Sequence, residues 1–178
     1  MSDHQTILKD AANIKLVVFD VDGVLTDGKL MLGESGNEYK SFHVRDGQGI
    51  VMLLKTKCNV AVITARTSSI VSERMTSLGI KHIYQGEKDK GSALVKLIEQ
   101  LKITLSEVAY VGDDVVDLPA MNKVALPIAV ADAHPEVKKL AKLITINSGG
   151  QGAVREICEL IMIAQNNFDE QIKAYLSL

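Results

Sequence analysis

The chain has 178 residues and a mass of 19.3 kDa, a length that suits one compact domain, since domains average about 150 residues. Lysine and arginine number 20 against 22 aspartates and glutamates, and 47% of the residues are hydrophobic. These values exclude the strongly basic surface of a nucleic-acid-binding protein and the composition of a disordered chain. We therefore expect residues 1–178 to form a single domain.

The sequence offers no candidate for a membrane span or a secretory signal. The longest apolar runs, 124–131 and 160–164, fall short of the roughly 18 residues that a spanning helix needs. The first residues lack a basic start and an apolar centre, so we expect a cytoplasmic location. Cys58 and Cys158 lie far apart without metal-binding spacing, and we expect both to be core residues rather than a disulfide or zinc site.

Strand and helix patterns alternate along most of the chain. Apolar runs that are rich in β-branched residues and end in a polar residue or glycine occur at 15–20, 59–64, 107–114 and 125–130. Such runs are typical of strands that are buried on both faces of a parallel sheet. The alternation predicts an α/β fold with a doubly wound, Rossmann-like parallel sheet flanked by helices, in which ligands bind beyond the carboxyl ends of the strands.

Helical spacing of apolar residues appears between and after these strands. Asp46 is the expected N-cap of a first helix over residues 50–54, and Gly79 is the expected C-cap of a second. A third helical pattern covers 93–101, and a last one runs from Val154 to about Phe168.

One segment, residues 28–44, breaks this rhythm with two short extended runs around a Gly-Glu-Ser-Gly-Asn turn. It predicts a β-hairpin flap, and no room is left for a larger cap domain. An isolated hairpin is marginally stable, and Leu30, Met31 and Leu32 give this one apolar surface, so we expect it to pack on another copy of the chain. The alternative is that the flap folds back on its own domain.

The stretch FDVDGVLTDG, residues 19–28, places two carboxylates directly after the first strand. A chain that bends at Val21 and Gly23 can direct Asp20 and Asp22 at one ligand. The pair predicts a metal or catalytic site, with a solvated turn as the alternative.

The stretch YVGDDVVD, residues 110–117, adds three carboxylates after another buried strand: Asp113, Asp114 and Asp117. Carboxylates gathered in one crevice repel each other unless a cation compensates them, and an all-oxygen site suits Mg²⁺ better than zinc. For Asp114 and Asp117 the alternative role is helix capping.

Two further residues lie where a phosphate would need partners. Thr64 ends the second strand, and Lys90 begins the helix after GEKDKG. A cation placed opposite the metal would neutralise the oxygens of a phosphoryl group during its transfer. Taken singly, Thr64 could be an ordinary strand end and Lys90 a solvated helix residue.

The ordered set of Asp20, Asp22, Thr64, Lys90 and GDDVVD resembles the four motifs of the haloacid dehalogenase superfamily of phosphatases. The resemblance implies that Asp20 is the nucleophile and forms a phosphoaspartyl intermediate. Asp22 would protonate the departing alcohol and then activate water. Mg²⁺ would be held by the carboxylates of Asp20 and Asp113 and by the backbone carbonyl of Asp22.

By the same resemblance, Thr64 and Lys90 bind the phosphate. Asp117 and Asp114 would orient Lys90 and the metal-bound water.

Further motifs, among them FHVRDGQGI, ITARTS, YQGEKDKG and GGQGAVRE, resemble the 3-deoxy-D-manno-octulosonate 8-phosphate phosphatases, a capless, tetrameric branch that acts in lipopolysaccharide sugar synthesis. The resemblance implies a sugar-acid phosphate as substrate and a homotetramer. Arg66 favours this branch over the phosphatases of nine-carbon, sialic-type sugars, in which glutamate is expected at this position. Ala65 departs from the usual Thr-Gly-Arg of the branch.

The carboxylate of such a substrate needs cationic partners at the crevice mouth. The candidates are Arg66, Arg74, His43 and Arg45, with solvated or locally paired side chains as the alternative. The tail from 149 to 178 carries three glycines before its helix, and we expect it to close over the sugar with Arg155 as a tether.

Two other classes of protein share part of this pattern. A receiver-like signalling domain also combines acidic residues, a threonine and a lysine on a doubly wound sheet, but there the lysine comes last, whereas Lys90 precedes Asp113. A catalytically silent assembly subunit is the other alternative, although every expected catalytic position is filled.

Overall fold

The structure is a computed structural model that describes residues 4–34 and 36–177. Its centre is a six-stranded parallel sheet in the order β5-β4-β1-β6-β7-β8. The strands are β1 (Leu16–Phe19), β4 (Asn59–Ile63), β5 (His82–Tyr84), β6 (Val108–Gly112), β7 (Leu126–Ala129) and β8 (Leu143–Ile144). The four predicted strands are confirmed. The edge strands β5 and β8 were not predicted because they are short and only partly buried, and so lack a continuous apolar run.

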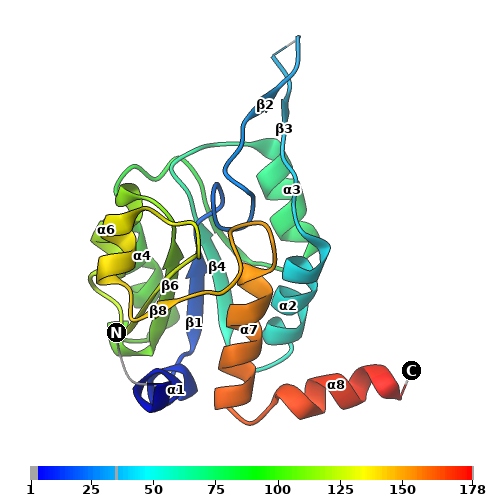
Figure 1. Ribbon diagram of the computed structural model, residues 1–178, viewed down its shortest axis with the longest axis vertical. Helices are drawn as coiled ribbons and strands as arrows, with labels where there is room; N and C mark the ends of the chain where they lie inside the picture. The colour runs from blue at the N-terminus through cyan, green and yellow to red at the C-terminus, as the bar shows by residue number, and fades with distance from the viewer. Residues whose placement is uncertain (1–3, 35, 178) are drawn as a thin grey trace.

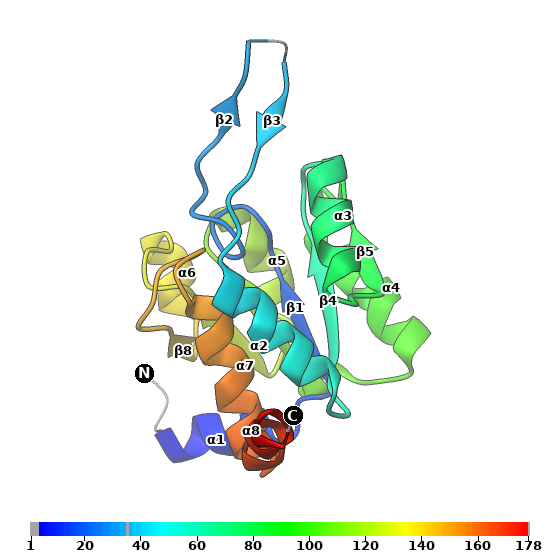
Figure 2. The ribbon, with the colours of Figure 1, turned by 90° about the vertical axis from the view of Figure 1, so that its right-hand side faces the viewer.

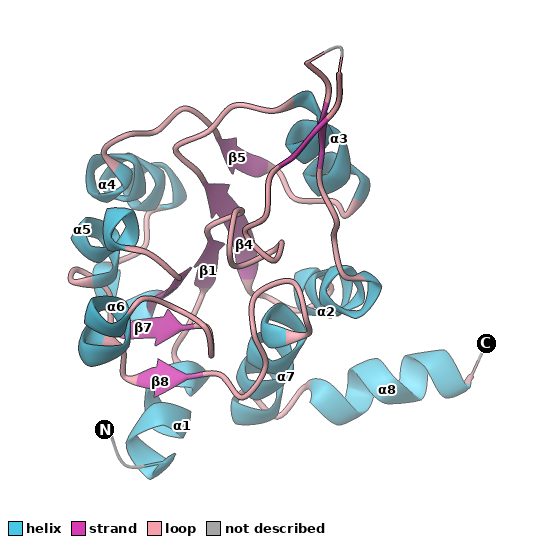
Figure 3. Ribbon diagram, turned by 45° about the horizontal axis from the view of Figure 1, so that its top comes forward, coloured by secondary structure: helices cyan, strands magenta, loops and turns pink. Residues whose placement is uncertain are grey.

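Helices cover both faces of the sheet (Figure 3). On one face lie α2 (Val44–Leu54), α3 (Ser69–Ser77) and α7 (Ala153–Ala164), with α1 (His4–Ala12) packed against α7. On the other face lie α4 (Lys90–Leu101), α5 (Leu118–Met121) and α6 (Pro135–Leu140). Short 3₁₀ helices, η1 (Leu105–Glu107) and η2 (Val115–Asp117), flank β6. The doubly wound α/β fold is therefore confirmed.

Two helix boundaries differ from the prediction. The last apolar pattern is split, because α7 ends at Ala164, Asn166 adopts a left-handed conformation (φ 57°), and a separate helix, α8 (Phe168–Leu176), extends away from the body (Figure 1). Asp46 is not the N-cap of α2, which begins at Val44 after His43.

Asp46 instead caps a different helix. Its carboxylate is buried and accepts hydrogen bonds from the backbone N–H groups of Gly152 (3.2 Å) and Arg155 (2.8 Å) at the start of α7. A capping carboxylate satisfies whichever unpaired N–H groups lie nearest, and the packing of α2 against α7 brings those of α7 within reach.

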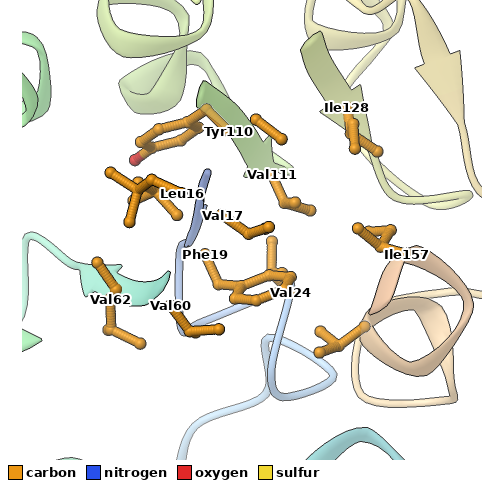
Figure 4. Close-up of a cluster of buried hydrophobic side chains, with 14 of the residues drawn as sticks. Leu16, Val17, Phe19, Val24, Val60, Val62, Tyr110, Val111, Ile128 and Ile157 are labelled. Carbon is orange, nitrogen blue, oxygen red and sulfur yellow. The ribbon is translucent and has the colours of Figure 1, made fainter. Parts of the chain in front are cut away.

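The core surrounds the central strands (Figure 4). Every residue of β1 is fully buried, and Phe19 lies among Val24, Val60 and Ile157. Both cysteines are buried and unpaired, as expected of core residues. The C-cap of α3 is Leu78 and not Gly79 as predicted; Gly79 follows it with a positive φ of 87°, the conformation in which glycine commonly ends a helix. Among the described helices, none has the length and hydropathy needed to cross a bilayer.

The sheet order places a topological switch point beyond the ends of β1 and β6. Phe19 at the end of β1 is in register with Val62 of β4 on one side and Val111 of β6 on the other. The chain leaves β1 toward α2 on one face of the sheet and leaves β6 toward α5 on the opposite face. Ligands bind at such a switch point in open α/β sheets.

The predicted flap is confirmed as a hairpin that projects from the domain (Figures 1 and 2). It pairs β2 (Met31–Leu32) with β3 (Glu38–Tyr39), and residue 35 lies outside the described residues. The apolar side chains on this hairpin are exposed rather than folded onto the sheet domain, with exposed fractions of 52% for Met31 and 71% for Leu32.

Candidate active site

Three carboxylates converge at the switch point. Asp20 follows β1, while Asp113 and Asp117 follow β6, and one carboxylate oxygen from each lies within 4.8 Å of the others. Lys90, the first residue of α4, completes the cluster: its Nζ lies 2.8 Å from Asp20 Oδ1 and 2.7 Å from Asp117 Oδ1. All four residues were singled out from the sequence.

Asp117 is the structural anchor of this cluster. It is fully buried and accepts hydrogen bonds from the backbone N–H groups of Asp113 (3.1 Å) and Asp114 (3.4 Å), as well as from the Tyr110 hydroxyl (3.1 Å). These bonds fix the carboxylate that orients Lys90. The contribution of Tyr110 was not predicted, although a hydroxyl in a buried strand signals that it needs a polar partner.

The electrostatics of the cluster call for a cation in addition to Lys90. Burial and the neighbouring Asp117 raise the pKa of Asp20 from 3.8 to about 7, although Lys90 opposes the shift. Burial and Asp20 raise the pKa of Asp113 to about 8. The pKa of Lys90 is raised, because its two carboxylate partners outweigh the effect of its burial.

Two oxygens of the cluster are suited to coordinate a metal ion. Asp20 Oδ1 and Asp113 Oδ1 are buried and accept no hydrogen bond from any described residue; the contact of Asp20 Oδ1 with Lys90 is an ion pair without hydrogen-bond geometry. Carboxylate oxygens that lie close together and accept no hydrogen bond are the kind of donor that Mg²⁺ prefers. The residues present therefore fit a magnesium ion.

Close backbone packing holds the loop after β1 against this cluster. Gly23 has a φ of 94°, and a Cβ atom there would lie 2.1 Å from Asp113 Oδ2. A Cβ atom at Gly149 would lie 1.7 Å from the carbonyl oxygen of Gly23. Gly150 donates its N–H to the carbonyl of Val24 (2.9 Å). The glycines before α7 thus pack against the loop after β1. Closure of this tail over a sugar stays a prediction.

Asp22 lies beside the stem of the hairpin. Its carboxylate contacts the Lys40 ammonium, and Arg66 Nε is 3.7 Å from its Oδ2. Lys40 Nζ and Arg66 Nη2 also lie 3.0 and 3.1 Å from Glu38 Oε1. Sequence reasoning identified Asp22 and Arg66 but missed Lys40 and Glu38, because a lysine and a glutamate in a hairpin are usually solvated.

Thr64 and Asp114 lie at the edge of the cluster. Thr64 directly follows β4 and is buried, and the backbone N–H of Arg66 is 3.4 Å from its hydroxyl oxygen. Asp114 accepts a hydrogen bond from the N–H of Val115 (2.7 Å) and caps η2. Its capping role is thus visible in the structure, while a role toward metal-bound water stays a prediction.

The other cationic candidates lie away from the carboxylate cluster. The Arg74 guanidinium packs on α2, 2.4 Å from where a Cβ atom of Gly47 would lie. His43 Nδ1 is 3.9 Å from Asp46 Oδ2. Arg45 is exposed and lines a surface groove with Arg155. Contacts of Arg74, His43 and Arg45 with a substrate stay predictions.

A surface cavity of about 1270 Å³ lies at the opposite end of the sheet. It is lined by residues that precede the strands, such as Lys15 before β1 and Glu107 before β6, and by none of the carboxylates above. The chemistry of the side chains, and not the size of the cavity, therefore locates the candidate site.

A doubly wound sheet with an aspartate pair after its first strand and a lysine paired to a second acidic cluster defines a class of hydrolases. The model of the haloacid dehalogenase-like hydrolase family matches residues 51–157, and the chain belongs to this family. It is 48% identical over 164 residues to 3-deoxy-D-manno-octulosonate 8-phosphate phosphatase KdsC of Escherichia coli K12, with 92% of this chain and 87% of that protein covered.

Solved structures agree with this relationship. The crystal structure of 3-deoxy-D-manno-octulosonate 8-phosphate phosphatase from Moraxella catarrhalis, in complex with magnesium, phosphate and KDO, is 43% identical with a TM-score of 0.95, and the match covers 97% of this chain and 99% of that one. The cobalt-bound enzyme from Haemophilus influenzae is 44% identical with a TM-score of 0.86, over 89% and 93% of the two chains.

Proposed function

We propose that this chain is a Mg²⁺-dependent phosphatase that releases inorganic phosphate from 3-deoxy-D-manno-octulosonate 8-phosphate. The observation that carries the proposal is the cluster of Asp20, Asp113, Asp117 and Lys90 at the sheet switch point. The identity of 48% to a phosphatase of this substrate, over nearly the whole chain, supports it. The receiver-like alternative is disfavoured because Lys90 precedes Asp113 in the chain and because the chain belongs to the hydrolase family.

In the proposed reaction, a carboxylate oxygen of Asp20 attacks phosphorus while the bond from phosphorus to the sugar oxygen breaks. Asp22 gives a proton to that leaving oxygen. Asp22 then takes a proton from a water molecule, which attacks the phosphoaspartate, releases inorganic phosphate and restores the Asp20 carboxylate. Splitting the displacement in this way makes each step easier, and one neighbouring acid–base serves both halves.

The remaining residues hold charge in place. Lys90, fixed by Asp117, and the hydroxyl of Thr64 bind the phosphoryl oxygens. The carboxylates of Asp20 and Asp113, with the backbone carbonyl of Asp22, would hold Mg²⁺. The ion supplies positive charge that keeps these carboxylates ionised and stabilises charge on the phosphoryl group.

The substrate assignment to an eight-carbon sugar acid is supported by Arg66. Its guanidinium is beside Asp22 and its side chain is 47% exposed, so it can meet a carboxylate or hydroxyl of the bound sugar. A nine-carbon, sialic-type sugar acid phosphate is the alternative substrate, which a direct comparison of rates separates.

The proposal includes self-association as a homotetramer. The projecting hairpin exposes Leu30, Met31, Leu32 and Tyr39, and the site has no cap domain of its own among the described residues. A second copy of the chain would bury this apolar surface. The cytoplasmic location expected from the sequence is part of the same proposal, and cell fractionation tests it.

The test of the proposed function is phosphate release from a panel of phosphorylated sugars and sugar acids, with Mg²⁺ and with EDTA. We expect 3-deoxy-D-manno-octulosonate 8-phosphate to be hydrolysed with the highest kcat/KM and EDTA to abolish the activity. Asp20→Asn, which keeps the side-chain shape, should be inactive. Parental activity in this variant, or in EDTA, would contradict the proposal.

A further inference from the structure

The ammonium group of Lys40 is buried in the stem of the hairpin, next to the proposed acid–base. Lys40 directly follows β3, and only 1% of its side chain is exposed. Its Nζ contacts Asp22 Oδ1 and lies 3.0 Å from Glu38 Oε1. The chemistry proposed above makes no use of this lysine.

A lysine that is removed from water needs negative partners, because an unpaired buried charge is costly. Asp22 and Glu38 supply them, so the Lys40 side chain is fixed between two carboxylates. Asp22 lies in the turn after β1, and 19% of its own side chain is exposed. Lys40 therefore restricts the Asp22 carboxylate to the side of its loop that faces the hairpin stem.

Arg66 contacts Asp22 as well, but at a longer distance and with a more exposed side chain than Lys40. Its Nε is 3.7 Å from Asp22 Oδ2, and about half of its side chain is exposed. Exposed ion pairs at such distances are weak because water screens them. An incoming anion can therefore take Arg66 as a partner, whereas the buried Lys40 remains with Asp22.

We propose that Lys40 is a positioning residue that holds the Asp22 carboxyl group where it can reach first the leaving oxygen and then the attacking water. Glu38 holds Lys40 in turn. This inference rests on the proposed function, since it concerns the proposed acid–base. Because Lys40 and Glu38 belong to the hairpin, the placement of the hairpin determines the rate of proton transfer at Asp22.

The test compares Lys40→Met with Lys40→Arg and with Lys29→Met. Methionine has about the length of the aliphatic part of lysine but carries no charge. Lys29 is a matched control on the same hairpin, with 79% of its side chain exposed and, among the residues that the structure describes, only Asp27 as an ion-pair partner. With the sugar phosphate, we expect Lys40→Met to lower kcat by about 10- to 100-fold and to change KM by less than about threefold. Lys40→Arg should recover part of the loss, and Lys29→Met should match the parental enzyme.

A second measurement separates positioning from a loss of folded protein. p-Nitrophenyl phosphate has a leaving group that needs little protonation, so its first step depends weakly on Asp22 while water attack still requires it. Stopped-flow traces of Lys40→Met should show a burst of about one nitrophenolate per active site and then slow turnover. Glu38→Gln should show the same burst with a smaller loss of steady-state turnover. This variant replaces Lys40→Met in the test if Lys40→Met folds poorly.

Parental kcat in both Lys40→Met and Glu38→Gln would overturn the proposal. An equal loss of burst and steady-state rate would also overturn it, because that pattern reports fewer folded molecules rather than a misplaced Asp22. If the parental enzyme itself hydrolysed neither ester, the proposed function would fail, and the role of Lys40 would fall with it.

Discussion

Asp20, which is buried, and Asp113, which is half-buried, have carboxyl groups whose pKa values are raised to about 7 and about 8. The folded protein without metal therefore binds protons more tightly than the unfolded chain does. The stability that this provides is fully present below the unfolded pKa of 3.8 and is lost as the pH rises through the two folded pKa values.

We expect the Tm of the EDTA-treated protein to fall from about pH 4 to about pH 8 and to level off above that, because over this range the two groups are ionised in the unfolded chain but still hold protons in the folded protein. Mg²⁺ binds the ionised carboxylates, so the rise in Tm that it produces should be larger at the higher pH. Thermal unfolding followed by circular dichroism measures both effects. Asp113→Asn should flatten the pH dependence, and a Mg²⁺-induced shift that is the same at every pH would contradict the assignment.

The two proposed roles of Asp22 can be separated by substitution. In Asp22→Ala the backbone carbonyl remains, so Mg²⁺ affinity measured by isothermal titration calorimetry should stay within about threefold of the parental value. Turnover should fall by about 10²- to 10⁴-fold, the usual contribution of an acid–base group. Asp22→Asn is the companion variant that keeps a partner for Lys40. A collapse of Mg²⁺ affinity in either variant would show that the side chain, and not only the backbone, binds the metal.

The glycine loop before α7 is an element whose backbone supports the catalytic turn. Gly149 donates its N–H to Asp132 Oδ1 (2.9 Å), and its Cα faces the carbonyl of Gly23 so closely that no Cβ atom fits. Asp46 caps the helix that follows. The loop after β1, the loop that contains Gly149 and the N-terminus of α7 therefore form one packed unit.

Gly149→Ala should displace the turn at Gly23 and lower kcat by at least about tenfold, because misplacing a reacting group by about 1 Å has effects of this size. Ser148→Ala is a matched control in the same loop, since it removes a hydroxyl group and introduces no new Cβ atom. Steady-state kinetics with both variants, together with their thermal unfolding, measures the effect. Parental kcat in Gly149→Ala would show that the loop can move away from Gly23 without consequence.

At the scale of the whole molecule, the exposed apolar side chains of the hairpin are the evidence for assembly. Leu32 is 71% exposed on the hairpin, and Leu176 is 81% exposed at the other end of the molecule. We expect Leu32→Glu to shift the protein toward smaller species in size-exclusion chromatography with light scattering, because a charge in an apolar interface is costly. Leu176→Glu is the control and should leave the assembly unchanged. A parental mass for Leu32→Glu would contradict the hairpin interface.

Local patterns in the chain determined the central strands and most of the candidate site. Each strand of the sheet centre is a continuous apolar run, because both of its faces are buried. Asp20, Thr64 and Asp113 directly follow such runs, and parallel strands bring their carboxyl ends to one edge of the sheet. Lys90 begins a helix that its neighbour Asp89 caps, which is again a local signal.

Only the tertiary structure decided which distant residues meet. Asp46 caps α7, which begins more than a hundred residues later. Lys40 is buried only because the hairpin stem lies against Asp22, and Gly149 is needed only because its loop crosses Gly23. The spacing of apolar residues in the sequence depends only on the helix or strand that contains them. The partners of a side chain and its pKa depend on which other elements pack beside it.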